Sequence, residues 1–192
     1  MSKSLEYEAR VMLSITQYNK LLEIVSDISP ITLINEYFDD DDCSIITNRK
    51  MLRIRNLNNK GYELTFKIKG QNGDTEVNQP LSPNERDLLI NKGQFPDGDV
   101  KEEVEKVVPI DSIKLITSLK TLRYEKRIDD YLFVLDKNEY NNITDYNLEI
   151  ESDDKQKSVN IIKKYCELYG MQYSESYKGK SRRAILSVKE NL

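Results

Sequence analysis

Acidic and basic side chains at alternate positions are the residues of this chain that could do chemistry. The segment SLEYEARVML places Glu6, Glu8 and Arg10 two residues apart, and NLEIE spaces Glu149 and Glu151 in the same way. Successive side chains of an extended chain point to opposite faces, so the charges of each segment share one face of a strand. Grouped carboxylates of this kind suit hard divalent cations, which prefer oxygen ligands.

Basic residues are concentrated in the first half of the chain. Between Arg49 and Lys69 there are seven basic residues and a single acid, Glu63, although the net charge of the whole chain is -4. Such a stretch indicates an anionic partner, but a solvated sheet face would produce the same pattern. The two interpretations stay open at this point.

Composition limits the classes of protein and of site. The 192 residues, 38% hydrophobic and 32% charged, are typical of one globular domain, which we expect to cover residues 1–192. The chain has no histidine, so it lacks the usual general base, and any metal must be held by oxygen. Its two cysteines are too few for a disulfide framework or a zinc ribbon. Without a long apolar run or a signal peptide, we predict no membrane partner and a cytoplasmic location.

Apolar periodicity predicts the elements that must position these charges. Helical spacing and capping residues predict helices over residues 15–28, 82–93, 100–107 and 155–169. Alternation predicts strands at the first charged segment and over LINEYFD, and hairpins over residues 51–70, turning at an Asn/Lys/Gly stretch, and 121–140. The segment DYNLEIES is predicted to be a strand, and the tail SYKGKSRRAILSV is predicted to end in a last strand. The acid-rich turn from Asp39 to Asp42 is interpreted as a solvated loop.

Charged strand faces have two physical explanations. An antiparallel sheet with one face in water would carry them at little cost. However, the signs sort by strand here, which causes like-charge repulsion unless a ligand or an opposing strand compensates it. If the strands close into a barrel, the charges line its lumen, and that lumen must hold water, metal and a polyanion.

Several motifs, in order along the chain, resemble those of the CYTH superfamily, the triphosphate tunnel metalloenzymes. The ExExK signature is similar to Glu6-Tyr7-Glu8-Ala9-Arg10, with Arg10 in place of the family lysine. The other matching segments are NEYFD, LRIR, LTFKIK, TLRYEKR, FVLD, NLEIE and KGKSRRA, and the matches run from residue 5 to residue 184.

The resemblance implies an α+β fold, an antiparallel eight-stranded closed or nearly closed β-barrel (a tunnel) flanked by helices. It implies a metal-dependent hydrolase that binds inorganic or small organic triphosphates inside the tunnel, with Mg2+ or Mn2+ as cofactor and Glu8 as the suggested general base. The implied metal ligands are Glu6, Glu8, Asp136, Glu149 and Glu151. The implied phosphate-binding residues are Arg10, Arg53, Arg55, Lys67, Lys69, Arg123, Arg127, Lys178, Lys180 and Arg183.

Two other functions fit the same residues. One is a class IV-like adenylate cyclase on this fold, although no residue can be tied to adenine. The other is a non-catalytic module that binds polyphosphate or nucleotides, which the replacement of the family lysine by Arg10 would suit. A nucleic-acid partner is not expected, because the chain is net acidic. The physiological triphosphate and the oligomeric state do not follow from the sequence.

Overall fold

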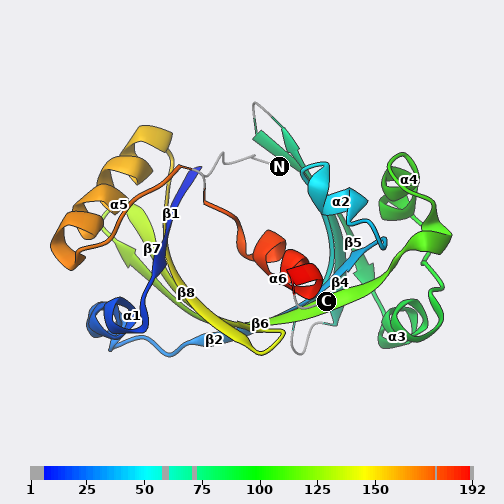
Figure 1. Ribbon diagram of the computed structural model, residues 1–192, viewed down its shortest axis with the longest axis horizontal. Helices are drawn as coiled ribbons and strands as arrows, with labels where there is room; N and C mark the ends of the chain where they lie inside the picture. The colour runs from blue at the N-terminus through cyan, green and yellow to red at the C-terminus, as the bar shows by residue number, and fades with distance from the viewer. Residues whose placement is uncertain (1–6, 58–60, 71–72, 176, 191–192) are drawn as a thin grey trace. The chain divides into compact units, whose positions relative to one another are not determined.

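The computed structural model describes residues 7–57, 61–70, 73–175 and 177–190, and its strands form one eight-stranded sheet (Figure 1). The hydrogen-bonded order is β1-β8-β7-β6-β2-β3-β4-β5. The strands are β1 Tyr7–Leu13, β2 Ile31–Asp39, β3 Lys50–Asn56, β4 Tyr62–Gly70, β5 Gly73–Leu81, β6 Lys114–Ile128, β7 Tyr131–Tyr140 and β8 Ile143–Ser152. The helices are α1 Ile15–Leu21, η1 Leu22–Val25, α2 Ser44–Thr47, α3 Pro83–Lys92, α4 Asp99–Glu105, η3 Ile110–Ser112, α5 Lys155–Tyr169 and α6 Lys180–Glu190.

The expected fold class is confirmed: an α+β fold with an eight-stranded sheet, antiparallel in the strand pairs whose register is described, and accompanied by helices. Within the described residues, the hydrogen-bonded order begins at β1 and ends at β5 and does not close into a ring. The chain divides into two compact units, unit 1 over residues 1–32 and 121–178, and unit 2 over residues 33–120 and 179–192. No helix in the described ranges is long and apolar enough to span a membrane.

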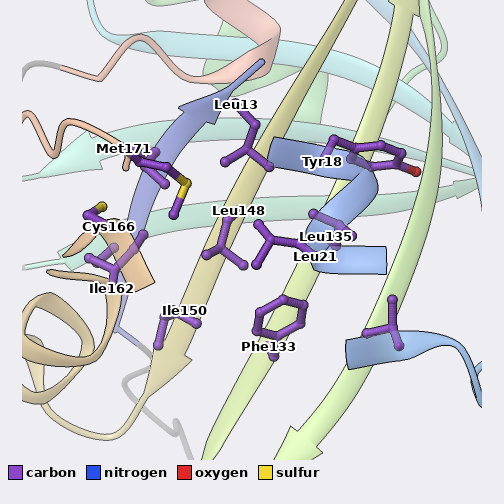
Figure 2. Close-up of a cluster of buried hydrophobic side chains, with 13 residues drawn as sticks. Leu13, Tyr18, Leu21, Phe133, Leu135, Leu148, Ile150, Ile162, Cys166 and Met171 are labelled. Atoms are coloured by element: carbon purple, nitrogen blue, oxygen red, sulfur yellow. The ribbon is translucent and has the colours of Figure 1, made fainter. Parts of the chain in front are cut away.

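Unit 1 has its own hydrophobic core on one face of β1, β8 and β7. Alternate residues of these strands meet side chains of α1, η1 and α5, and Figure 2 shows Leu148, Ile150, Phe133 and Leu135 beside Leu21. The helix expected over residues 15–28 is shorter in α-form, because a 3-10 turn, η1, follows α1. Burial of this face leaves the alternate positions of the same strands for polar side chains.

A short turn fixes the register of β7 and β8. Asn141 and Asn142 both have positive φ, the conformation of the two-residue turns that match the twist of a hairpin. On the other side of β8, strand β1 pairs with it so that Arg10 is opposite Glu149 and Glu8 is opposite Glu151. Side chains directly opposite each other share one face of a sheet, so the charged residues of both strands come together.

Unit 2 has a second core, built on β2, β3 and β4. Phe38, Leu52, Leu64 and Phe66 are fully buried with residues of α3 and α4, among them Leu89. The predicted hairpin over residues 51–70 is confirmed as β3 and β4, although residues 58–60 of its expected turn lie outside the described residues. Arg53 and Arg55 therefore point to the face opposite this core.

Two elements differ from the sequence-based expectation. The tail was expected to end in a strand, but Lys180–Glu190 is a helix, α6, in which Ala184, Ile185 and Ser187 are buried at helical spacing. The apolar run AILSV suits either element, and burial along one helical face decides it here. Strand β5 was not predicted, because its apolar positions are few and it contains Pro80.

The first residue of the acid-rich turn is not solvated. Asp39 is fully buried, its Oδ1 accepts hydrogen bonds from the backbone N–H of Asp40 (2.9 Å) and Ile45 (2.8 Å), and its Oδ2 accepts from Ile46 N–H (2.9 Å). Burial raises the pKa of Asp39, while the three N–H donors act in the opposite direction. The interpretation of the turn as a solvated loop is therefore wrong for Asp39, which fixes the start of α2.

Candidate metal and phosphate site

Three carboxylates gather on the polar face of unit 1. Oxygens of Glu8, Glu149 and Glu151 lie within 4.8 Å of one another. Glu8 comes from β1, and the other two come from β8, which pairs with β1 in the register described above. Glu149 is 2% exposed, whereas 39% of the Glu8 side chain is exposed, so the cluster extends from the buried part of the face to its surface. Three acids this close repel one another unless a cation compensates them.

Arg10 supplies one internal cation to this cluster. Its Nη2 pairs with Glu8 Oε1, and its Nε lies 3.3 Å from Glu149 Oε1. Burial acts to lower the pKa of Arg10, but the charges of Glu149 and Glu8 outweigh it and hold this pKa above its ordinary value. The guanidinium carbon also lies 5.8 Å from the centre of the Tyr177 ring. Arg10 Nε is nevertheless buried without a hydrogen-bond partner in the described structure.

Arg123 and Asp136 form a buried ion pair beside the cluster. Arg123 Nε donates to Asp136 Oδ1 and Arg123 Nη2 donates to Asp136 Oδ2, both at 2.8 Å, which is the two-pronged geometry of a strong arginine–carboxylate pair. The same Nη2 donates to Glu149 Oε2 at 3.1 Å. Burial acts to lower the pKa of Arg123, and Asp136 raises it above its ordinary value. Arg123 thus holds Glu149 in place while Asp136 holds Arg123.

Two buried asparagines continue this network, and the sequence analysis did not identify them. Asn138 Nδ2 donates to Asn147 Oδ1 (2.7 Å) and to Asp145 Oδ1 (2.9 Å). Asn147 Nδ2 donates to Asp136 Oδ2 and to Glu149 Oε1, both at 3.3 Å. Both amides are fully buried. The available signal was the alternation, since Asn138 lies two residues after Asp136 and Asn147 lies two residues before Glu149.

The basic residues of β3 and β4 lie on the polar face of unit 2. Arg55 Nε donates to Asn35 Oδ1 at 3.1 Å, and Lys67 Nζ lies 2.9 Å from Glu76 Oε1. Arg53 is directly opposite Thr65, and both Arg53 Nε and Thr65 Oγ1 are buried without a hydrogen-bond partner in the described structure. Buried polar atoms normally have partners, so two adjacent exceptions indicate a place where a polar ligand can bind.

The remaining predicted residues are spread over several elements. Arg127 is exposed near the end of β6, and Lys69 is exposed near the end of β4. Lys180 is the first residue of α6 and Arg183 lies one turn later, whereas Lys178 precedes the helix. Glu6 lies outside the described residues. Asp136 is not a member of the carboxylate cluster in the described structure, because its oxygens bind Arg123.

The donor set of unit 1 fits a divalent metal ion. All three ligands are carboxylates, their oxygens are close enough to share one ion, and the chain has no histidine to favour a softer metal. The polarity of the face and the position of Arg10, close to two of the acids, further suit a site where metal and phosphate oxygens are bound together.

Comparison with known proteins gives consistent matches along the chain. The family model of the CYTH domain matches residues 4–181. A protein of Bacillus subtilis (strain 168) named "Putative triphosphatase YjbK" is 30% identical over 181 residues, which is 92% of each chain.

Solved structures show the same fold. The crystal structure of a protein from Bacillus halodurans, described as a "putative adenylate cyclase", has a TM-score of 0.80 at 26% identity and covers 95% of this chain and 98% of its own. The structure of HpAC1 from Hippeastrum, described as a "putative adenylyl cyclase" with a dominant triphosphatase activity, has a TM-score of 0.68 and covers 92% of this chain and 93% of its own. At 19% identity the second likeness shows the fold alone.

Proposed function

This chain belongs to the CYTH family, and from that premise we propose that it hydrolyses inorganic or small organic triphosphates with the help of Mg2+ or Mn2+. The observation that carries the proposal is the cluster of Glu8, Glu149 and Glu151, whose oxygens lie within 4.8 Å of one another. Acids gathered beside phosphate would only weaken its binding, so their presence argues for a metal ion between the two.

The metal-binding part of the proposal rests on unit 1. Glu8, Glu149 and Glu151 would hold the ion, and the hydrogen bonds from Arg123 and Asn147 fix the carboxylate of Glu149 for that purpose. A bound divalent ion supplies charge neutralisation of the phosphate oxygens and a lowered pKa of attacking water. Asp136 is proposed as a positioning residue for Arg123, in place of the direct metal contact that the family resemblance implied.

The phosphate-binding part rests on the basic residues. Arg53, Arg55, Lys67 and Lys69 share one face of unit 2, where arginine can bind phosphate oxygens through two hydrogen bonds and lysine acts as a point charge. The unpartnered Nε of Arg53 and Oγ1 of Thr65 support this role. Arg10, Arg123, Arg127, Lys178, Lys180 and Arg183 are the further bases proposed for the substrate.

The proposed reaction needs no covalent intermediate. The oxygen of water forms a bond to the terminal phosphorus while the bond from that phosphorus to the bridging oxygen breaks, which gives phosphate and the shortened polyphosphate or its organic ester. The water loses one proton, and we assign its acceptance to Glu8, which is the more exposed of the two acids that contact Arg10. The basic residues stabilise the charge that develops on the leaving oxygen.

The test is phosphate release from inorganic triphosphate, ATP and thiamine triphosphate, each with Mg2+, with Mn2+ and with EDTA. We expect metal-dependent release by the wild type and a loss of at least a hundredfold in Glu149→Gln, because the substitution removes a metal-binding charge from the cluster. Glu139→Gln is the matched control, since Glu139 pairs with Lys137 at 2.6 Å and is not part of the cluster. Its activity should be unchanged.

Other outcomes would replace the proposal. Conversion of ATP to diphosphate and a cyclic nucleotide, without release of phosphate, would show a cyclase, the activity named for the relative from Bacillus halodurans. Tight binding of triphosphate without turnover in any metal would show a binding module. Equal activity with EDTA and with Mg2+ would refute the metal site.

A further inference from the structure

Arg10 shares two carboxylates, Glu8 and Glu149, with the proposed metal site. It contacts Glu8 Oε1 and lies 3.3 Å from Glu149 Oε1, and both acids belong to the cluster that a divalent ion would use. A guanidinium and a divalent ion that bind the same oxygens would lie within a few ångströms of each other, where their like charges repel strongly. Binding of one cation to these acids therefore weakens their attraction for the other.

The contacts of Glu149 indicate which cation yields. Arg123 is held by both oxygens of Asp136 in addition to Glu149, so it cannot move without breaking a buried ion pair. The second partner of Arg10 is Glu8, whose side chain is 39% exposed, so this anchor is weaker than the fully buried Asp136 that holds Arg123. Its Nε is buried but makes no hydrogen bond within the described residues, so the existing contact with Glu149 satisfies that atom poorly.

We infer that Arg10 and the divalent ion compete for Glu8 and Glu149, so that ion binding releases the Arg10 guanidinium to bind phosphate oxygens. The inference rests on the metal site of the proposed function and adds an order to its binding events. The Tyr177 ring, 5.8 Å from the guanidinium carbon, can keep the released side chain near the site through a cation–π contact. Binding of the ion would then create a phosphate ligand as well as neutralise the acids.

The first experiment measures Mn2+ affinity by electron paramagnetic resonance of the free ion, without any phosphate present. Arg10→Gln removes the competing charge, so we expect this variant to bind Mn2+ about tenfold more tightly than the wild type. Arg10→Lys keeps the positive charge but loses the planar guanidinium that can donate two hydrogen bonds at once. Its Mn2+ affinity should therefore lie between those of the wild type and Arg10→Gln. Lys157→Gln is the matched control, because Lys157 is also held by two carboxylates, Asp130 at 2.6 Å and Asp153 at 3.1 Å, outside the cluster.

The outcomes separate the inference from the proposed function. Binding of Mn2+ to Arg10→Gln that is equal to or weaker than binding to the wild type would overturn the competition and leave the metal site intact. Failure of both proteins to bind Mn2+ would overturn the metal site as well. Tighter binding in Arg10→Gln with no change in Lys157→Gln would support the competition.

A second measurement does not depend on the folding of Arg10→Gln. The Nε–Hε resonance of Arg10 can be assigned in the wild-type protein by comparison with Arg10→Lys, and it should shift when Mg2+ is added without phosphate. A resonance that stays in place at saturating Mg2+ would contradict release of the side chain. A shift on adding Mg2+ that Glu149→Gln abolishes would support it.

Discussion

At the scale of single residues, charge pairing within the polar face of unit 1 decides which groups remain for a ligand. Asp136 and Arg123 were expected to contact metal and phosphate separately, and the structure joins them at 2.8 Å through two hydrogen bonds. A fully buried carboxylate with such a partner is costly to alter, because its removal leaves the guanidinium incompletely paired. The pair is therefore a structural support of Glu149.

We predict that Asp136→Asn lowers the free energy of unfolding by about 3 kcal/mol, since it breaks a buried ion pair. Urea denaturation followed by circular dichroism measures the change. The matched control is Asp130→Asn, which removes an exposed carboxylate that pairs with Lys157 and should change the free energy of unfolding far less. In a double-mutant cycle with Arg123→Met, the summed losses of unfolding free energy in the two single variants should exceed the loss in the double variant. Strict additivity would contradict the pairing.

The charged residues could be predicted from the sequence, but their partners could not. Alternation placed Glu8 with Arg10, and Glu149 with Glu151, on one face of a strand, and the structure pairs the two strands so that these residues meet. Periodicity specifies the face of a strand but not the distance between side chains of different strands. That is why the two buried asparagines were missed, whereas Asp136 was named as a metal ligand on the family resemblance alone.

At the scale of elements, two neighbouring acids support the start of α2, and Asp40 Oδ1 accepts from the backbone N–H of Ser44 at 2.7 Å. Asp39 accepts three backbone hydrogen bonds, two of them from residues of this four-residue helix. Such a helix has too few internal hydrogen bonds to be stable alone, so an acceptor at its beginning carries much of its stability. Asp39, interpreted from the sequence as part of a solvated loop, therefore binds the first backbone N–H groups of a helix.

We predict that Asp39→Asn destabilises the protein by about 1–2 kcal/mol at pH 7. The carboxylate accepts the three N–H donors with two oxygens, whereas the amide of asparagine has only one oxygen. The pH dependence follows from the raised pKa of Asp39. The ordinary pKa of an aspartate carboxyl is 3.8, and that of Asp39 in the folded protein is higher. The folded state therefore binds a proton more tightly than the unfolded state, and proton binding stabilises the folded state as the pH falls through the raised pKa. The stability advantage of the wild type over Asp39→Asn should therefore increase on acidification from pH 7 toward pH 4.

The same urea titrations at several pH values check this sign. An advantage that decreases on acidification would show that the three N–H donors outweigh burial and that the pKa is lowered. Asp42→Asn is the control, because Asp42 is exposed at the same turn. Its effect should be small at every pH.

The element predictions were right where capping and periodicity agreed. The helix over residues 82–93 was marked by Ser82, Pro83 and Glu85, and α3 has that capping box. The strand predicted for the tail was wrong, because a short apolar run fits the periodicity of a helix as well as that of a strand. Burial of Ala184 and Ile185 along one face selects the helix. Strand β5 was missed because it offers few apolar positions to a periodicity argument.

At the scale of the whole molecule, the chain has two hydrophobic cores, one in each compact unit. Leu148 belongs to the first core and Leu64 to the second, and both are fully buried. Each is surrounded by residues of its own cluster, so a cavity at either position should weaken its own unit most. The prediction of one domain over residues 1–192 remains a prediction.

We predict that Leu148→Ala and Leu64→Ala each cost about 2–5 kcal/mol and that the loss of hydrogen-exchange protection differs in location. Exchange measured by mass spectrometry should increase mainly in peptides of residues 121–175 for Leu148→Ala and of residues 33–120 for Leu64→Ala. Equal increases over the whole chain in both variants would indicate a single cooperative unit. Leu168→Ala, at a side chain 78% exposed, serves as the control.

The turn at Asn141 and Asn142 has a consequence for how this sequence can diverge. Its length fixes the pairing of β7 with β8 and thereby the face on which Glu149 lies. An insertion of one residue that shifted the pairing would turn Glu149 toward the apolar core and a hydrophobic neighbour toward the cluster. The length of this turn therefore limits which sequences can keep the carboxylate cluster. We expect relatives that keep the cluster to tolerate substitutions at this turn more readily than insertions or deletions.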